Sequence, residues 1–519
     1  MSKRPAVLMI GMDAAEVSLI QRWMDEGVLP NLRSMRDQGA FGPLASTAPW
    51  LVGSPWPSFY TGTPPSEHGF YHYLVWRPER MKHERPSPRW MPLRPFWRTI
   101  ASSRRVVAVD VPLAYAPETF DGTEISGWAT LETLDPPASH PAELIDWVYK
   151  TFGNAPFGNE EAHLLSAASL LEVRDRCVRT TERVGDLGVA LMQKEPWDLF
   201  MICFAATHRG GHQLWDLTNM AGEASAAQAK ALGGALKDIY VACDTAIGRL
   251  IGQAGSEATT LVFSLHGMGA NVSRSELLRE MLARVLAGHG ASDGPASRPR
   301  LTDRLRALLP TPLRSWIKNH LPIPIQDWLT MFWRTRGIDW SSARAFVALC
   351  DLDGYVRINL RGREAAGIVE PGAEYEALCT QIAQGLGSFI DADSGIPVVD
   401  AIARIKDLYP GGRVSDHLPD LMIRWCPKPA ALHRRIVSPR YGAIPWPTPG
   451  RAPDGRSGNH RPDGFLLASG ARMAQGIPIE GAHILDLVPT VFELLDLPLP
   501  AGLKGHSLLR TLEQRRGIS

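Results

Sequence analysis

The chain has 519 residues, of which 45% are hydrophobic and 21% are charged. This composition indicates a globular protein with one large domain and insertions, or with two domains. Its 55 Lys and Arg residues nearly balance 54 Asp and Glu residues, which gives a formal net charge of +1. Near-neutrality gives no electrostatic reason to expect nucleic acid or an anionic membrane as a partner.

The start of the chain and the cysteines indicate a cytoplasmic protein. Only a short apolar run, residues 6–12, follows the N-terminal Met-Ser-Lys-Arg-Pro. We therefore expect no export signal, and no stretch is long and apolar enough to predict a membrane span. The cysteines are scattered along the sequence, so we expect neither a disulfide framework nor a cysteine zinc site. They are Cys177, Cys203, Cys243, Cys350, Cys379 and Cys426.

Three apolar runs are predicted to be strands, and each is followed by residues able to bind a metal. Continuous apolar runs are typical of strands that are buried on both faces of a parallel sheet. Helix-like segments over 162–194 and 224–252 separate the runs, as a β-α-β pattern requires. The runs and the residues that follow them are 6–12 with Asp13, 198–204 with His208 and His212, and 259–264 with His266.

These polar residues are predicted to share one cleft. In open α/β sheets, ligands bind beyond the carboxyl ends of the strands. All three runs place their polar residues at that edge, so we expect Asp13, His208, His212 and His266 to lie close together.

Residues 273–337 differ in composition from the rest of the chain, because Arg, Pro, Leu and Trp are frequent there. We predict that they form an inserted, partly helical cap over or beside the cleft, while residues 1–272 and 338–519 form the main α/β domain. Packing of the tryptophans against the main domain is expected, with contact to a membrane surface or a partner as the alternative. The chain closes with a predicted helix over 484–495.

Three histidines are candidates for a metal site. His208 and His212 are four residues apart, a spacing that puts both on one face of a helix; Gly210 and Gly211 between them make a tight loop an equal alternative. His460 lies in a predicted polar, Gly-rich loop. Imidazole is a common zinc ligand, and three of them leave a coordination position open for water or substrate. If His208 and His212 are considered without His460, the alternative is that they are surface or helix-capping residues.

The N-terminal region carries a resemblance to a known family. Residues 30–39 begin Pro-Asn-Leu-Arg, and residues 46–69 end in Thr-Gly-Thr-Pro-Pro-Ser-Glu-His-Gly. This pattern resembles the type I phosphodiesterase and nucleotide pyrophosphatase branch of the alkaline phosphatase superfamily. Matching segments continue in the family's order, so the resemblance covers almost the whole chain. They are residues 211–215, 264–269, 356–364, 458–464 and 486–490.

The resemblance implies an alkaline phosphatase-like α/β fold, in which helices flank a mostly parallel central sheet. It also implies a two-metal site that is partly altered here. One ion would be held by His208, His212 and His460, with His208 in the place of the family's Asp. The second ion would use Asp13 and His266, but Leu265 stands where the family has an Asp ligand. Zinc is the expected metal, and manganese is the alternative.

The family's nucleophile is also altered, because an ungapped alignment places Val52 where the family has Ser or Thr. Ser54, just before Pro55, is our candidate nucleophile, because a helix N-terminus favours bound phosphate. The alternative is that Ser54 only caps the helix, and Thr47 is a weaker candidate. A metal-bound water could attack instead, with Asp13 or His266 as base or orienting group.

The sequence therefore predicts a metal-dependent hydrolase of a phosphodiester, a nucleotide pyrophosphate or a related phosphate ester. Its substrate would be a phosphorylated small molecule. The alternative is a catalytically degenerate relative that binds a metal or a phosphorylated ligand without turnover. Four histidines and Asp13 favour the enzyme, because such a polar cluster is costly to bury without a function.

Overall fold

The structure of the chain is a computed structural model, and most of the sequence is described by it. The part of the chain that the structure describes comprises residues 5–130, 133–154, 156–157, 164–218, 220–288, 321–335, 338–410, 416–428, 434–447, 455–470, 472–473 and 476–509.

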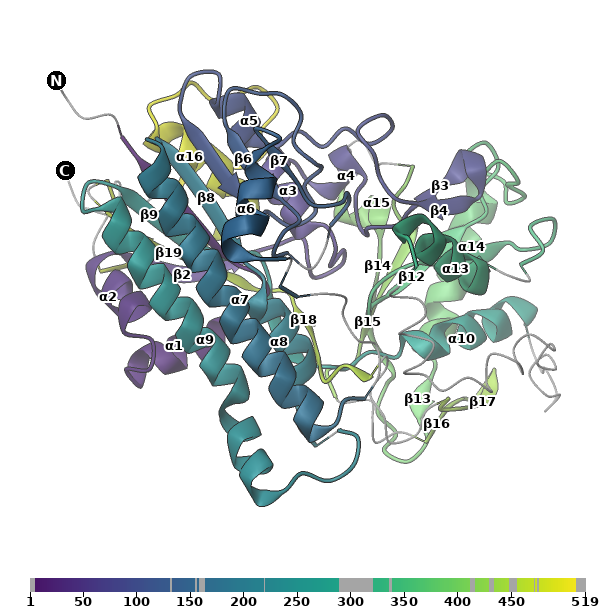
Figure 1. The fold of residues 1–519 in the computed structure, drawn as a ribbon. Coiled ribbons are helices and arrows are strands. Elements are labelled where there is room, and N and C mark those ends of the chain that lie inside the picture. The colour runs from purple at the N-terminus through teal and green to yellow at the C-terminus, as the bar shows by residue number, and fades with distance from the viewer. Residues whose placement is uncertain are drawn as a thin grey trace.

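A ten-stranded, mostly parallel sheet forms the centre of the fold (Figure 1). Its middle strand is β1 (Val7–Met12), which pairs in parallel with β8 (Leu199–Phe204) on one side and β9 (Thr259–Ser264) on the other. Every residue of these three strands is buried. The three predicted strands and the parallel sheet are thereby confirmed.

Further strands extend the sheet on both sides of these three strands. Beyond β8 lie β5 (Val106–Val109), β6 (Thr123–Ser126) and the antiparallel β7 (Ala138–His140). Beyond β9 lies β19 (Gly464–Ser469), which is antiparallel to both β9 and β2 (Ala40–Ala45). The short strands β20 (Ile477–Pro478) and β21 (Ala482–His483) pair with β2.

Helices cover both faces of the sheet because successive side chains of a strand point to opposite faces. Leu8, Ile10 and Met12 of β1 pack on one face, whereas Val7 and Met9 pack on the other. The first face is covered by α1 (Val17–Asp25), α2 (Pro30–Gln38), α6 (Leu144–Phe152), α7 (Ala167–Lys194) and α9 (Ala226–Ala254). The second is covered by α3 (Pro55–Thr61), α5 (Phe96–Ile100) and α16 (Leu487–Leu494).

The long helices α7 and α9 run side by side across the sheet (Figure 1). They correspond to the helices predicted over 162–194 and 224–252. The predicted closing helix is also present, as the 3₁₀ turn Ile484–Asp486 followed directly by α16.

A second lobe, drawn mainly in green in Figure 1, lies beside the central sheet and has its own hydrophobic core. It is built on an antiparallel sheet in the order β11 (Ala345–Ala348), β12 (Gly354–Ile358), β15 (Leu421–Trp425) and β14 (Val399–Arg404). Helices α10 (Ser275–Ala287) and α14 (Ala373–Gly387) pack together in this lobe. Smaller elements are β13 (Ile390–Asp391), β16 (Arg435–Ser438), β17 (Gly442–Pro445) and α15 (Ile405–Leu408).

The predicted cap over 273–337 remains a prediction, because residues 289–320 and 336–337 lie outside the described residues. Of the described part, α10 packs within the second lobe, and α13 (Ile323–Thr335) lies near β4 (Lys82–Glu84). An Arg85–Asp327 ion pair, with an N–O distance of 3.0 Å, holds α13 there. Trp328 is 60% exposed and stacks on Phe332, so the expected packing of tryptophans against the main domain is wrong for Trp328.

The remaining predictions about chain class concern membranes and cysteines. Among the described residues, no helix is long and apolar enough to cross a membrane. None of the six cysteines forms a disulfide.

His68 ties α4 (Pro65–His68) to α3 and makes folding sensitive to acid. Its Nδ1 accepts a hydrogen bond from the Phe70 amide (3.0 Å), and its Nε2 lies 3.0 Å from Ser58 Oγ. Burial lowers the pKa of His68 from 6.5 to about 3. Between these pH values the unfolded chain binds a proton that the folded chain excludes, so acidification favours unfolding. We expect the melting temperature of His68→Gln to fall less steeply from pH 6.5 to pH 4 than that of the wild type.

The control for this measurement is His506→Gln, because His506 is exposed. Its melting temperature should follow the wild-type pH dependence. Equal slopes for His68→Gln and the wild type would contradict the role given to His68.

Candidate metal centre

Helix α8 (Ala206–Leu214) follows β8 directly and carries His208 and His212 on one face. The Nε2 atoms of the two imidazoles lie 3.0 Å apart, and both side chains are buried. Of the two alternatives left open by the sequence, the helix is the one observed. The glycines allow it to pack closely, because a Cβ on Gly210 would lie 2.4 Å from Ile239 Cδ1 and a Cβ on Gly211 would lie 2.7 Å from Met268 Cγ.

His460 reaches the same place from a strand. The predicted polar loop is in fact β18 (Gly458–Arg461), which pairs antiparallel with β10 (Gly267–Ala270) and sets His460 opposite Met268. The loop prediction was wrong because polar, Gly-rich residues here form an isolated two-stranded ribbon with no apolar alternation. One nitrogen from each of His208, His212 and His460 lies within 4.8 Å of the others.

Asp13, at the end of β1, holds His208 in place. Its Oδ2 lies 2.7 Å from His208 Nδ1, and its Oδ1 accepts a hydrogen bond of 2.8 Å from Trp56 Nε1. Gly11 in β1 makes room for Trp56, since a Cβ there would lie 2.8 Å from the indole ring. Carboxylates that orient a ligating histidine in this way are common around protein-bound metals. Asp13 therefore contacts His208 of the three-nitrogen cluster directly, and its role as a metal ligand stays a prediction.

The second imidazole is anchored in the same manner. His212 Nδ1 lies 2.9 Å from the Gly458 carbonyl oxygen. When both Nδ1 atoms donate to these oxygens, the Nε2 lone pairs of His208 and His212 face each other at 3.0 Å. Such an arrangement is stable only when a cation or a proton lies between the lone pairs.

Burial keeps other imidazoles of the site neutral, as metal binding requires. Burial, helped by the neighbouring histidines, lowers the pKa of His460 well below 6.5, and burial lowers that of His266 to about 4. Burial alone would raise the pKa of Asp13, but the imidazoles of His208 and His266 hold it below its ordinary value. The site is therefore prepared to bind a cation with neutral nitrogen ligands.

A divalent metal fits the residues present. His460 Nδ1 is buried and has no hydrogen-bond partner among the described residues. The facing lone pairs of His208 and His212 are costly without a cation or a proton between them. Three imidazole nitrogens suit zinc, and they leave a fourth position for another ligand.

The predicted second half of the metal site is less complete. His266 follows β9, and its Nε2 lies 3.8 Å from Asp13 Oδ1, which already accepts a hydrogen bond from Trp56. Leu265 is buried in the hydrophobic core and offers no ligand atom. Among the described residues, Asp13 and His266 therefore lie near the three-nitrogen cluster but form no second group of three ligands.

A cavity of about 40 Å³ lies against the histidines. This volume holds a few water molecules, and ligand pockets are typically several hundred Å³. Asp351 is the only carboxylate among the described residues that line the cavity. The lining residues are Val52, Gly53, Pro55, Trp56, His72, Tyr73, Leu113, His208, His266, Asp351 and His460.

Ser54, the predicted nucleophile, is not one of these lining residues. It precedes α3 as predicted, but its side chain makes no capping hydrogen bond. Its hydroxyl is fully buried, donates to the Leu51 carbonyl oxygen (2.6 Å) and lies 2.7 Å from Thr47 Oγ1. This geometry argues against attack by either hydroxyl, because the pair is hydrogen-bonded within the protein and Val52 faces the cavity instead.

We expect Ser54→Ala to retain turnover within about threefold of wild type, because the Ser54 hydroxyl is not presented to the cavity. Steady-state rates would be measured alongside thermal stability, which should fall by about 1 kcal/mol with the lost buried hydrogen bond. The mass of the intact protein after acid quenching should show no phosphoryl adduct. Complete loss of turnover in a folded Ser54→Ala protein would reinstate Ser54 as the nucleophile.

Asp351, which lines the cavity, and its partner Arg456 were not predicted from the sequence. Asp351 lies in the second lobe, in the loop between β11 and β12, and its Oδ1 accepts a hydrogen bond of 2.6 Å from Arg456 Nη2. Burial alone would raise the pKa of Asp351, but Arg456 and neighbouring histidines lower it to about 2. An Asp-Leu-Asp-Gly turn far along the chain is too ordinary to predict such a position.

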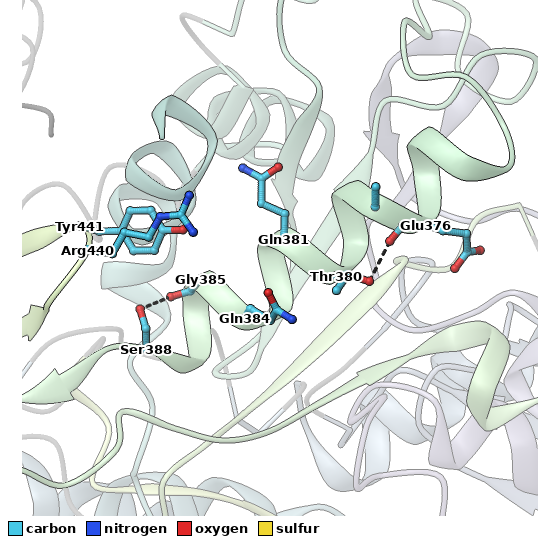
Figure 2. A pocket seen from close by; sticks show the side chains of 9 residues that line it. Glu376, Thr380, Gln381, Gln384, Gly385, Ser388, Arg440 and Tyr441 are labelled. Atoms are coloured by element: carbon cyan, nitrogen blue, oxygen red, sulfur yellow. Dashed lines mark hydrogen bonds between the residues drawn. The ribbon is translucent and has the colours of Figure 1, made fainter. Parts of the chain in front are cut away.

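A larger hollow of about 470 Å³ lies on the second lobe, along α14 and beside the β16–β17 turn (Figure 2). Its lining includes the amide side chains of Gln381 and Gln384 together with Arg440. The hydrogen bonds drawn in Figure 2 join Thr380 and Ser388 to backbone oxygens one turn away, so they stabilise the helix itself. Among the described residues, the histidine cluster therefore remains the better candidate for a catalytic site.

A mostly parallel α/β sheet with a buried imidazole cluster beyond its carboxyl edge defines a protein of the alkaline phosphatase-like class. Residues 7–423 match the type I phosphodiesterase/nucleotide pyrophosphatase family, and the chain belongs to this family. The relatedness that the N-terminal motifs indicated is thereby confirmed. No curated protein matches the sequence.

Solved structures with similarity to the chain include a phosphonoacetate hydrolase and ectonucleotide pyrophosphatases/phosphodiesterases. The phosphonoacetate hydrolase from Sinorhizobium meliloti 1021, in complex with phosphonoformate, is 12% identical with a TM-score of 0.48, and 95% of each chain is covered. Human ectonucleotide pyrophosphatase/phosphodiesterase 5 is 11% identical with a TM-score of 0.47, over 98% of this chain and 99% of that chain. An inactive murine form of that protein in complex with AMP is 12% identical with a TM-score of 0.45, over 96% of each chain.

Proposed function

We propose that the protein is a metal-dependent hydrolase of a phosphodiester or related phosphate ester, with a one-ion centre at His208, His212 and His460. The convergence of three imidazole nitrogens within 4.8 Å of one another carries this proposal. Membership of a family of phosphodiesterases and pyrophosphatases supports the reaction class. When bound, a divalent ion neutralises charge on a phosphoryl oxygen and makes water a better nucleophile. Zinc is the proposed metal, with manganese as the alternative.

The surrounding residues would hold the ligands and handle the proton. Asp13 and the Gly458 carbonyl fix the imidazoles of His208 and His212 through their Nδ1 atoms. His266 lines the cavity as a neutral imidazole, so it can accept a proton from the attacking water. A proton taken up by His266 is stabilised by Asp13, whose Oδ1 lies 3.8 Å from His266 Nε2.

Water is the proposed nucleophile because the cavity lining offers no serine or threonine among the described residues. Val52 and Gly53 occupy the part of the wall just before α3, where the family's hydroxyl would stand. Direct attack by water proceeds without a covalent phosphoryl-enzyme. The small cavity supports a substrate whose phosphate group enters alone while the remainder stays outside.

The test is turnover of the purified protein, first stripped of metal with a chelator and then reloaded with zinc or manganese. Bis-p-nitrophenyl phosphate reports diesterase activity, and p-nitrophenyl phosphate reports monoesterase activity. We expect the stripped protein to be inactive and the reloaded protein to hydrolyse the diester. Equal activity before and after stripping would contradict a metal-dependent reaction.

A second candidate function is metal or phosphate binding without turnover. Val52 and Leu265, which replace the nucleophile and a ligand of the family, favour it. Tight uptake of zinc together with no hydrolysis of either ester, with both metals tried, would support this binding function over the hydrolase.

A further inference from the structure

We infer that Asp351 of the second lobe is the fourth protein ligand of the proposed metal centre, through its Oδ2 atom. The inference rests on the proposed function, since it concerns the same ion. It assigns to Asp351 a role that neither the sequence motifs nor the family match indicates.

The position of Asp351 is the first observation that carries this inference. Its Oδ2 lies 3.8 Å from His460 Nε2. Two ligands of one tetrahedral zinc ion, each about 2.0–2.2 Å from the metal, lie roughly 3.4 Å apart. When His460 binds the ion through Nε2, Asp351 Oδ2 is within about half an ångström of the separation expected between two ligands of that ion.

The orientation of the carboxylate is the second observation. Arg456 Nη2 donates to Oδ1 at 2.6 Å, whereas its Nη1 donates a longer hydrogen bond of 3.4 Å to Oδ2. The shorter hydrogen bond thus falls on Oδ1, and Oδ2 is the oxygen that lies 3.8 Å from His460 Nε2. A bond from a second residue that fixes one oxygen of a ligating carboxylate is a common feature of metal sites.

The loop that carries Asp351 is held firmly by the second lobe. Trp425 Nε1 of β15 donates to the Leu352 carbonyl oxygen at 3.1 Å, and the Leu352 side chain is fully buried. Cys350 Sγ contacts the Asp353 carbonyl oxygen at 3.0 Å. The fixed loop therefore holds the Asp351 carboxylate at the cavity wall, where Arg456 balances its charge.

Charge balance provides a third argument. The three imidazoles contribute no charge to a divalent ion. Both oxygens of Asp13 make short contacts, with His208 and Trp56, whereas Oδ2 of Asp351 accepts only the longer bond from Arg456. Asp351 is the only carboxylate among the described lining residues of the cavity. Metal binding would then join both lobes, with His208, His212 and His460 from the central-sheet side and Asp351 from the other.

The test compares zinc affinity of full-length wild type, Asp351→Asn and the control Asp353→Asn. Asp353 lies in the same loop but does not line the cavity. Competition with a chromophoric chelator gives Kd, and the visible bands of the cobalt-loaded proteins report the ligand set. We expect Asp351→Asn to raise Kd by about 100-fold or more and to shift the cobalt bands, because a lost ligand exceeds the usual effect of an outer residue. Asp353→Asn should stay within about threefold of wild type.

A crystal structure of the zinc-loaded wild-type protein tests the inference without any variant, so the result does not depend on whether Asp351→Asn folds. We expect a distance of about 2.0–2.2 Å between zinc and Asp351 Oδ2. A distance beyond about 3 Å, or unchanged affinity and cobalt bands in Asp351→Asn, would overturn the inference. If His212→Ala then still abolished zinc binding and turnover, the proposed function would stand without Asp351.

Discussion

Replacing His212 by alanine is expected to remove the metal centre and with it the activity. The variant keeps only two of the three clustered nitrogens and loses the anchor to the Gly458 carbonyl oxygen. Zinc content, measured by mass spectrometry of the dialysed protein, should fall from one ion per chain to none. Turnover should fall at least 10³-fold, corresponding to about 4 kcal/mol of lost transition-state stabilisation.

The matched control is His506→Ala, since His506 is exposed and distant in sequence from the cluster. It should bind one zinc ion and turn over substrate as the wild type does. Full zinc occupancy in a folded His212→Ala protein would mean that the ion binds elsewhere.

Adding a single methyl group at Gly458 is expected to separate the two elements that form the centre. A Cβ on Gly458 would lie 2.0 Å from the Gly211 carbonyl oxygen and 3.1 Å from Trp215 Cβ. Because a carbonyl oxygen in a buried helix cannot move aside easily, β18 must shift away from α8 and take His460 with it. We expect Gly458→Ala to lose about 3 kcal/mol of unfolding free energy, the upper end of typical overpacking costs, and to weaken zinc binding more than 100-fold.

Gly233→Ala provides the comparison, because nothing lies within 4 Å of a Cβ at this exposed position of α9. There alanine should stabilise the helix by up to about 1 kcal/mol. Denaturant unfolding and zinc titration measure both effects. Unchanged zinc affinity in Gly458→Ala would show that the close approach of β18 to α8 is not needed for the centre.

The central strands could be predicted because their apolar residues indicate that they are buried. In β1 and β8 every residue is apolar, and β9 carries an apolar Leu-Val-Phe run, as strands covered on both faces require. The second lobe was not recognised as a unit, because its sheet is assembled from short strands separated by long connections. The pairing of β12 with β15, across more than 60 residues, leaves no local pattern to detect.

The candidate site could be predicted in part, because several of its residues follow the buried strands. Residues that directly follow a buried strand, Asp13 and His266, and those on the next helix, His208 and His212, come together because parallel strands share one edge. The polar contacts of Asp13 with His208 and of Ser54 with Leu51 depend on side-chain directions that spacing does not specify. Asp351 was not predicted, because no local sequence pattern indicates that the second lobe approaches the central sheet.

The substitutions at Val52 and Leu265 need not mean loss of function. Both remove groups that a two-ion, covalent mechanism requires, and neither disturbs the three-nitrogen cluster. A one-ion centre that uses water needs neither a hydroxyl at position 52 nor a carboxylate at position 265. The altered residues and the retained cluster are thus compatible with one mechanism.

The proposed one-ion hydrolase can be tested by titrating the metal-stripped protein with zinc while following hydrolysis of bis-p-nitrophenyl phosphate. We expect activity to rise in proportion to added zinc and to reach its plateau at one equivalent per chain. A plateau at two equivalents would contradict the one-ion centre, and no hydrolysis at any zinc concentration would contradict the hydrolase itself.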